Sequence, residues 1–175
     1  MIKLLDILKE IKTYRKELVG DGEQGDVYPI GKDKVVKKVF EDWDDEEIKT
    51  YKLFNQHPDL FPHVYKIAKD YVIMDRIDSP AKELTDAVEF LRSNMWLHDG
   101  IDGIYKSIRN NNLKQFNQIL QKAKELNKID IYNTLKKCFE FFTKLHKLFP
   151  NRYIDANNGN TGIDRRDGKI KIFDL

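Results

Sequence analysis

Apolar residues recur every three or four positions along much of the chain, which is the period of amphipathic α-helices. This pattern predicts helices over residues 2–18, 46–54, 81–98, 104–126 and 129–149. The last helix is rich in aromatic residues, which we interpret as core packing. Residues 34–40 are rich in valine and predict a strand. Near the end of the chain, a short strand, an Asp167–Gly168 turn and a second strand over 169–173 are expected.

Composition narrows the class of protein without defining its chemistry. The 31 basic and 29 acidic side chains give a net charge of +2, which is too even to favour nucleic-acid or membrane binding. The single cysteine excludes an internal disulfide and fits a reducing compartment. No apolar run approaches the roughly 20 residues that span a bilayer, and the first residues do not resemble a signal peptide. We therefore expect a cytoplasmic protein with no membrane contact.

A glycine-rich stretch begins at Gly20 and continues through Gly22 and Gly25 to Val27. The G-x-G-x-x-G spacing alone is weak, because it also occurs in dinucleotide-binding folds, where it opens a helix. Here the strand-like stretch 34–40 follows instead. Glycines between two strands would let backbone N–H groups approach phosphates closely. The alternative is an ordinary hairpin with glycine at its bends.

A cation and an anion follow the glycines in order. Lys37 lies on the predicted strand 34–40, and Glu46 and Glu47 open the predicted helix 46–54. A strand lysine that binds phosphates is usually fixed by a helix glutamate. Taken singly, Lys37 and Lys38 could both be solvent-facing, and the glutamates could simply favour a helix start. Because neighbouring strand residues face opposite ways, only one of the two lysines can enter a binding cleft, and we favour Lys37.

Three hard oxygen ligands are spaced along the end of the chain: Asp155, Asn160 and Asp174. Mg²⁺ prefers carboxylate and amide oxygens, usually with phosphate and water completing its shell. A polar hairpin whose Asp and Asn residues only make turns is the alternative interpretation.

Taken in order, these motifs resemble the protein-kinase-like superfamily. The stretch from Gly20 to Val27 matches every fixed position of its glycine-rich loop. Val35-Val36-Lys37-Lys38-Val39 is similar to the strand that carries the phosphate-binding lysine. Glu47, ahead of His57-Pro58, is similar to the partner glutamate and the turn that follows its helix.

The resemblance continues through the second half of the chain. Tyr71-Val-Ile-Met-Asp-Arg-Ile77 resembles the hinge strand, which implies that Met74 guards the back of the pocket and that main-chain groups of Asp75 to Ile77 meet adenine. Tyr153-x-Asp155-x-x-x-x-Asn160 matches the catalytic loop. Asp174 falls where the metal-binding aspartate belongs.

The resemblance implies an α+β, two-lobed fold. Residues 1–77 would form an antiparallel sheet with one helix, and residues 78–175 a reduced helical lobe with the catalytic hairpin. It also implies ATP as substrate and Mg²⁺ or Mn²⁺ as cofactor. Asp155 would serve the acceptor hydroxyl, Lys37 braced by Glu47 would hold the phosphates, and Asn160 with Asp174 would hold the metal.

The chain also departs from protein kinases. Asp155-Ala156-Asn157 replaces the Asp-Leu-Lys of protein kinases and is closer to aminoglycoside- and choline-kinase-like phosphotransferases. Only Leu175 follows Asp174 in this sequence, so the platform on which protein kinases bind peptides is not expected. We therefore expect the acceptor to be a small molecule or one dedicated protein. A kinase-like pseudoenzyme that engages a partner protein and a Ser/Thr protein kinase are the alternatives.

Overall fold

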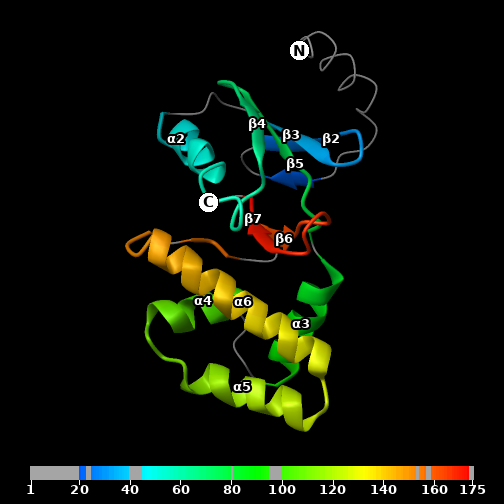
Figure 1. Ribbon diagram of the computed structural model, residues 1–175, viewed down its shortest axis with the longest axis vertical. Coiled ribbons are helices and arrows are strands. Elements are labelled where there is room, and N and C mark those ends of the chain that lie inside the picture. The colour runs from blue at the N-terminus through cyan, green and yellow to red at the C-terminus, as the bar shows by residue number, and fades with distance from the viewer. Residues whose placement is uncertain are drawn as a thin grey trace. The chain divides into compact units, whose positions relative to one another are not determined.

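The computed structural model describes residues 20–22, 25–39, 45–79, 81–94, 100–152, 154–156 and 159–173 (Figure 1). The predicted helix over residues 2–18 lies outside these ranges. The chain divides into two compact units, Met1–Arg76 and Ile77–Leu175.

The first unit is built on a five-stranded sheet in the order β1-β2-β3-β5-β4. Every neighbouring pair is antiparallel, so the predicted antiparallel N-terminal sheet is confirmed. The valine-rich stretch forms the central strand, as its β-branched residues favour. The strands are β1 (Gly20–Gly22), β2 (Gly25–Ile30), β3 (Lys34–Val39), β4 (Val64–Ile67) and β5 (Tyr71–Asp75).

The register of β2, β3 and β5 fixes the two faces of this sheet. Directly opposite residues of antiparallel strands share a face, and successive residues alternate. Tyr28, Val36 and Ile73 are opposite one another. Val36 and Ile73 are buried, and Tyr28 packs against them with Ile30 and Tyr71. This face is therefore a small hydrophobic core.

Helix α2 (Asp45–Phe54) follows β3 and confirms the predicted helix 46–54 to within one residue. It buries Tyr51 and Phe54. The Phe54 ring stacks on Phe61, with 4.4 Å between centroids and 9° between ring planes. The helix is therefore held by aromatic packing against the segment that leads into β4.

The second unit is mainly helical, as predicted, and ends in a two-stranded antiparallel hairpin. Helix α6 contacts the three other helices of this unit and is its central element. Among the described helices, none is long and apolar enough to cross a bilayer. The elements are α3 (Lys82–Ser93), α4 (Asp102–Arg109), α5 (Lys114–Glu125), α6 (Ile129–Leu148), β6 (Thr161–Ile163) and β7 (Ile170–Ile172).

The buried side of α6 lies in the core of the second unit. It consists of Leu135, Cys138, Phe141, Phe142 and Leu145, at helical spacing. Complete burial raises the pKa of the Cys138 thiol to about 12, because an apolar interior disfavours the thiolate. The single cysteine is therefore a packing residue, as its neighbours are.

The prediction of one helix over 104–126 is wrong. The structure has two helices, α4 and α5, separated by residues 110–113. Asn111 adopts a positive φ of 50°, which asparagine tolerates better than most residues. The backbone N–H of Asn112 donates to the Ser107 carbonyl at 2.9 Å and closes the end of α4. Consecutive asparagines thus end a helix that the apolar period alone would continue.

The predicted helix over 81–98 is also too long, because α3 ends at Ser93. Asn94 leaves the helical conformation, with φ of −107°. Its side-chain Nδ2 donates to the Phe90 carbonyl at 2.7 Å, which satisfies one of the carbonyls that a helix end leaves without a partner.

Candidate functional site

Lys37 lies on the central strand and is only 5% exposed. It is opposite Val27 on β2 and Val72 on β5, so the three side chains share a face of the sheet. Lys38 is exposed and lies on the other face. A buried ammonium group is costly unless polar or charged groups surround it. Such surroundings are typical of a ligand-binding position.

Met74 lies on the same face, one pair of residues further along the ladder. It is opposite Val35, which is opposite Pro29. Because side chains alternate along a strand, Val35 and Lys37 point the same way, and Met74 therefore shares their face. Met74 is 2% exposed. The register thus brings together Val27, Lys37 and Met74, which sequence reasoning had picked out separately.

The glycine-rich stretch forms the edge hairpin of the same sheet. Gly20 is opposite Val27, and Gly22 is opposite Gly25. The glycines therefore lie within paired strands, and residues 23 and 24 between them lie outside the described residues. Glycine in an edge strand leaves the backbone accessible to a ligand, because no side chain intervenes.

The residues predicted to form the hinge have part of their main chain already engaged. The Asp75 N–H donates to the His63 carbonyl at 3.0 Å, and the Arg76 N–H donates to the Asp33 carbonyl at 2.8 Å. A base could therefore not use these N–H groups. The expectation that main-chain groups from Asp75 to Ile77 meet adenine is narrowed to their carbonyl groups and the N–H of Ile77.

Glu47 lies in the first turn of α2 and is partly buried. An acidic residue there is favoured by the positive end of the helix dipole, whatever its function. Its proposed role as the brace of Lys37 stays a prediction.

In the second unit, Asp155 is exposed between two buried residues, Ile154 and Ala156. Both neighbours are 0% exposed, so they anchor the chain while the carboxylate faces solvent. Asn160 closes the loop, because its Nδ2 donates to the Asp155 carbonyl at 3.1 Å and to the Asp155 Oδ2 at 3.3 Å. The five-residue spacing between the two residues is therefore spanned by direct hydrogen bonds.

Asn160 is also tied to the final strand. Its carbonyl accepts a hydrogen bond from the Phe173 N–H at 3.0 Å, just beyond the β6–β7 ladder that pairs Thr161 with Ile172. The chain immediately before Asp174 is thus held beside Asn160. Asp174 itself lies outside the described residues.

The predicted metal ligands, Asn160 and Asp174, therefore stay a prediction. Because the Asn160 amide nitrogen is engaged with Asp155, its oxygen is the atom that could ligate a cation. An amide oxygen is a ligand that suits Mg²⁺. Within the described ranges, no group of three or more His, Cys, Asp or Glu side chains could hold a metal ion.

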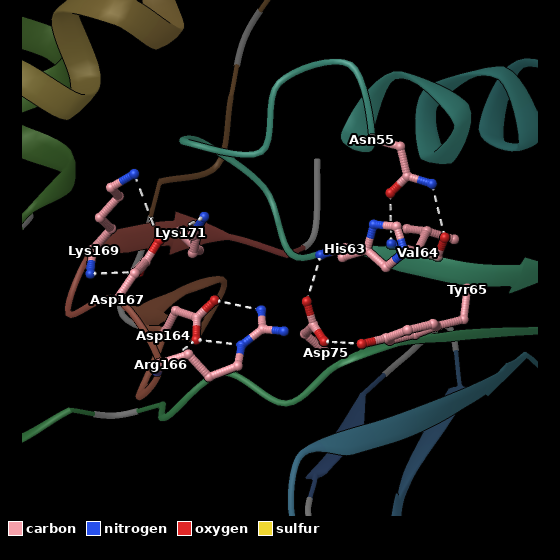
Figure 2. Close-up of polar contacts among 10 residues, drawn as sticks. All are labelled: Asn55, His63, Val64, Tyr65, Asp75, Asp164, Arg166, Asp167, Lys169 and Lys171. Atoms are coloured by element: carbon pink, nitrogen blue, oxygen red, sulfur yellow. Dashed lines mark hydrogen bonds and ion pairs between the residues drawn. The ribbon is translucent and has the colours of Figure 1, made fainter.

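The turn of this hairpin is fixed by a charged pair that sequence reasoning missed (Figure 2). Arg166 binds the buried carboxylate of Asp164 through Nε at 3.1 Å and Nη2 at 2.8 Å. These hydrogen bonds hold the pKa of Asp164 below its usual range. The pair therefore stabilises the fold at neutral pH, and this contribution is lost as the pH falls through the lowered pKa of Asp164.

The chain just after the predicted hinge pairs with β6, which was also not foreseen. The N–H groups of Asp78 and Ile163 each donate to the carbonyl of the other residue at 3.0 Å. Arg165 adds an ion pair with Asp78. A Cβ on Gly162 would lie 2.3 Å from the Asp78 carbonyl oxygen, so only glycine permits this approach. An isolated glycine in a strand pattern is a sequence signal for such a contact.

The chain ahead of Asp155 is anchored by the helices. The Tyr105 hydroxyl donates to the Arg152 carbonyl at 3.2 Å. Its ring is fully buried against Phe142 and His146 of α6. The helical core thus positions the chain just ahead of Asp155.

Comparison with known proteins gives no family assignment. No protein-family model matches this chain, and no curated protein sequence matches it. Two solved structures of the aminoglycoside phosphotransferase APH(2″)-IIa are similar to it, each at 13% identity over 99% of this chain. One is a ternary complex with streptomycin and ATP (TM-score 0.37, 71% of that chain), and the other is a gentamicin complex (TM-score 0.38, 70%). At this distance the similarities assign no function to this chain.

Replacement of Gly162 by alanine tests the close approach to Asp78. We expect Gly162→Ala to lower the free energy of unfolding by about 2–3 kcal/mol, because the added methyl group separates two mutually hydrogen-bonded backbones. Gly168→Ala is the matched control. Gly168 has a positive φ of 66° but open space around its Cβ position, so only backbone strain is added.

The control should cost about 1 kcal/mol. Both values can be measured by urea denaturation monitored by circular dichroism. Equal losses in the two variants would show that the Asp78–Ile163 pairing is not tight.

Proposed function

We propose that this chain is an ATP-dependent phosphotransferase that moves the γ-phosphoryl group to an acceptor hydroxyl. The observation that carries the proposal is the shared face of Val27, Lys37 and Met74. In the protein-kinase-like pattern these three positions all serve the nucleotide. The three residues come from three different strands, and strand pairing places their side chains on one face. An accidental match of short motifs would not require that arrangement.

The first unit supplies groups suited to a nucleotide. Lys37 would hold the α- and β-phosphates, with Glu47 as its brace, and the edge hairpin from Gly20 to Gly25 would cover them. Catalysis of phosphoryl transfer consists mostly of positioning and of charge neutralisation. A buried lysine on the central strand of a sheet suits the positioning of phosphates, because few side-chain conformations are available to it.

The second unit supplies the group suited to the acceptor. The exposed carboxylate of Asp155 would orient the hydroxyl and accept its proton. The Asn160 Nδ2 donates to Oδ2 of this carboxylate at 3.3 Å, which favours one of its orientations. Mg²⁺ or Mn²⁺, when bound by Asn160 and Asp174, would neutralise charge on the transferring phosphates.

The acceptor is proposed to be a small hydroxyl compound or one dedicated protein. Ala156 is buried and Asn157 follows it, where protein kinases carry leucine and lysine. That lysine assists transfer to a serine or threonine hydroxyl, so its replacement argues against generic peptide substrates.

Replacing each of the two neighbouring lysines by alanine tests whether Lys37 binds the nucleotide. We expect Lys37→Ala to raise the Kd for Mg-ATP at least about tenfold, because a charge-assisted contact to phosphate is lost. Lys38→Ala lies on the opposite face and should leave the Kd within about twofold. Calorimetric titration of both variants makes the comparison, and an unchanged Kd in Lys37→Ala would contradict the assignment.

Replacement of Asp155 tests the acceptor role. Asp155→Asn keeps the size of the side chain but cannot accept the proton, so we expect transfer to fall by about 10²–10⁴-fold with ATP affinity nearly unchanged. ATP consumption is measured across a panel of small hydroxyl compounds, with casein as the generic protein substrate.

Little or no casein phosphorylation is expected. Robust casein phosphorylation that Asp155→Asn abolishes would restore the protein-kinase alternative. ATP binding without transfer to any acceptor in the panel would favour the pseudoenzyme alternative.

A further inference from the structure

The carboxylate of Asp75 is held by two donors from the segment that begins β4 (Figure 2). The His63 N–H donates to Oδ2 at 2.9 Å, and the Tyr65 hydroxyl donates to Oδ1 at 2.8 Å. In return, the Asp75 N–H donates to the His63 carbonyl at 3.0 Å. Asp75 is only 1% exposed. The end of β5 is therefore fastened to β4 through both its main chain and its side chain.

The donors are themselves fixed in position. Asn55, just after α2, donates to the Val64 carbonyl and accepts from the Val64 N–H, both at 2.8 Å. This contact holds the main chain between His63 and Tyr65 (Figure 2). A side-chain amide that pairs with both main-chain groups of one residue acts like an additional strand partner.

The Tyr65 ring is held from two sides. The His63 ring meets it edge-on, with 4.6 Å between the ring centroids. The Lys34 ammonium lies 3.9 Å from the Tyr65 ring centroid, and Lys34 is opposite Asp75 in the sheet. A cation over an aromatic face is favourable, and this one lies beside the ring whose hydroxyl binds the carboxylate. The hydroxyl donor is thus pre-positioned although Tyr65 is 45% exposed.

We propose that Asp75 and Tyr65 are positioning residues for the base of the bound nucleotide. This inference rests on the proposed function and on the expectation that main-chain groups of Asp75 to Ile77 meet adenine. The Arg76 N–H is also fixed, by the Asp33 carbonyl at 2.8 Å. The main chain is therefore held at Asp75 through its carboxylate and at Arg76 through its amide. Hydrogen bonds to a base weaken steeply with misalignment, so a loosened main chain would bind the base less well.

Tyr65→Phe tests the proposal with little change in shape. It removes one hydroxyl from a half-exposed side chain and leaves the ring in place. We expect the Kd for Mg-ATP to rise about fivefold, while the affinity for Mg-tripolyphosphate, which has no base, stays unchanged. Tyr71→Phe is the control, because Tyr71 lies on the same strand as Asp75, its ring packs against Val36 and Ile73, and the Lys66 ammonium lies 5.3 Å from its ring centroid. It should leave both affinities unchanged.

Substitution of Asp75 itself supplies a second measurement. Asp75→Asn can still accept from the His63 N–H and donate to the Tyr65 oxygen, so it should weaken ATP binding by at most about threefold. Asp75→Ala removes both contacts and should weaken it at least about tenfold. We therefore expect the Asp75→Asn variant to bind Mg-ATP more tightly than the Asp75→Ala variant.

The outcomes separate the two proposals. Wild-type protein that binds ATP, together with a Tyr65→Phe variant of equal ATP affinity, would overturn the positioning role alone. Equal weakening of ATP and tripolyphosphate binding would also overturn it, because a general loosening of the unit affects both ligands. Wild-type protein that binds no ATP would overturn the proposed function itself.

Discussion

The antiparallel pairing of β2, β3 and β5 is the constraint on which the nucleotide-binding proposal depends. Side chains alternate along each strand, so a register shifted by one residue would send Lys37 to the opposite face and bring Lys38 to its place. The hydrophobic cluster of Val36 and Ile73 opposes that shift, because it would separate these packed residues and bring the exposed Lys38 onto the face where Val72 and Met74 are buried. Packing on one face of the sheet thus fixes the chemistry available on the other.

In the second unit, hydrogen bonding and packing together set the position of the functional candidates. Asp155 is placed by its buried neighbours and by Asn160, and Asn160 is placed by the Phe173 N–H. The hairpin that carries these contacts is short, and each strand has three residues. Its stability depends on the pairing with Asp78 and on the ion pair between Asp164 and Arg166. A short hairpin needs such partners, because two strands alone are marginally stable in water.

The sequence predicted elements whose pattern is strong and local. The central strand, helices α2 and α6 and the Gly168 turn follow from β-branched runs, apolar period and turn chemistry. Alternation along the strand predicted that only one of Lys37 and Lys38 is buried, and the structure shows that it is Lys37. Strand β4 was missed because it has only four residues and its first two side chains after Val64 are exposed.

Long-range contacts could not be predicted from the sequence, for a different reason. The pairing of Asp78 with Ile163 joins segments far apart in the chain, and no local pattern marks Asp78. The α4–α5 break was missed because the apolar period continues across it, although Asn110 to Asn112 were a visible signal. The side chain of Asp75 was passed over because the kinase-like pattern assigns a role only to its main chain.

Binding of Mg-ATP to the unmodified chain tests the central claim most directly. Thermal unfolding is followed with and without the nucleotide over a range of concentrations. A ligand that binds only the folded state at 100 times its Kd stabilises it by about 2.7 kcal/mol, so the midpoint should rise with each increase in nucleotide. A midpoint that does not move at millimolar Mg-ATP would contradict the assignment of this chain as an ATP-dependent phosphotransferase.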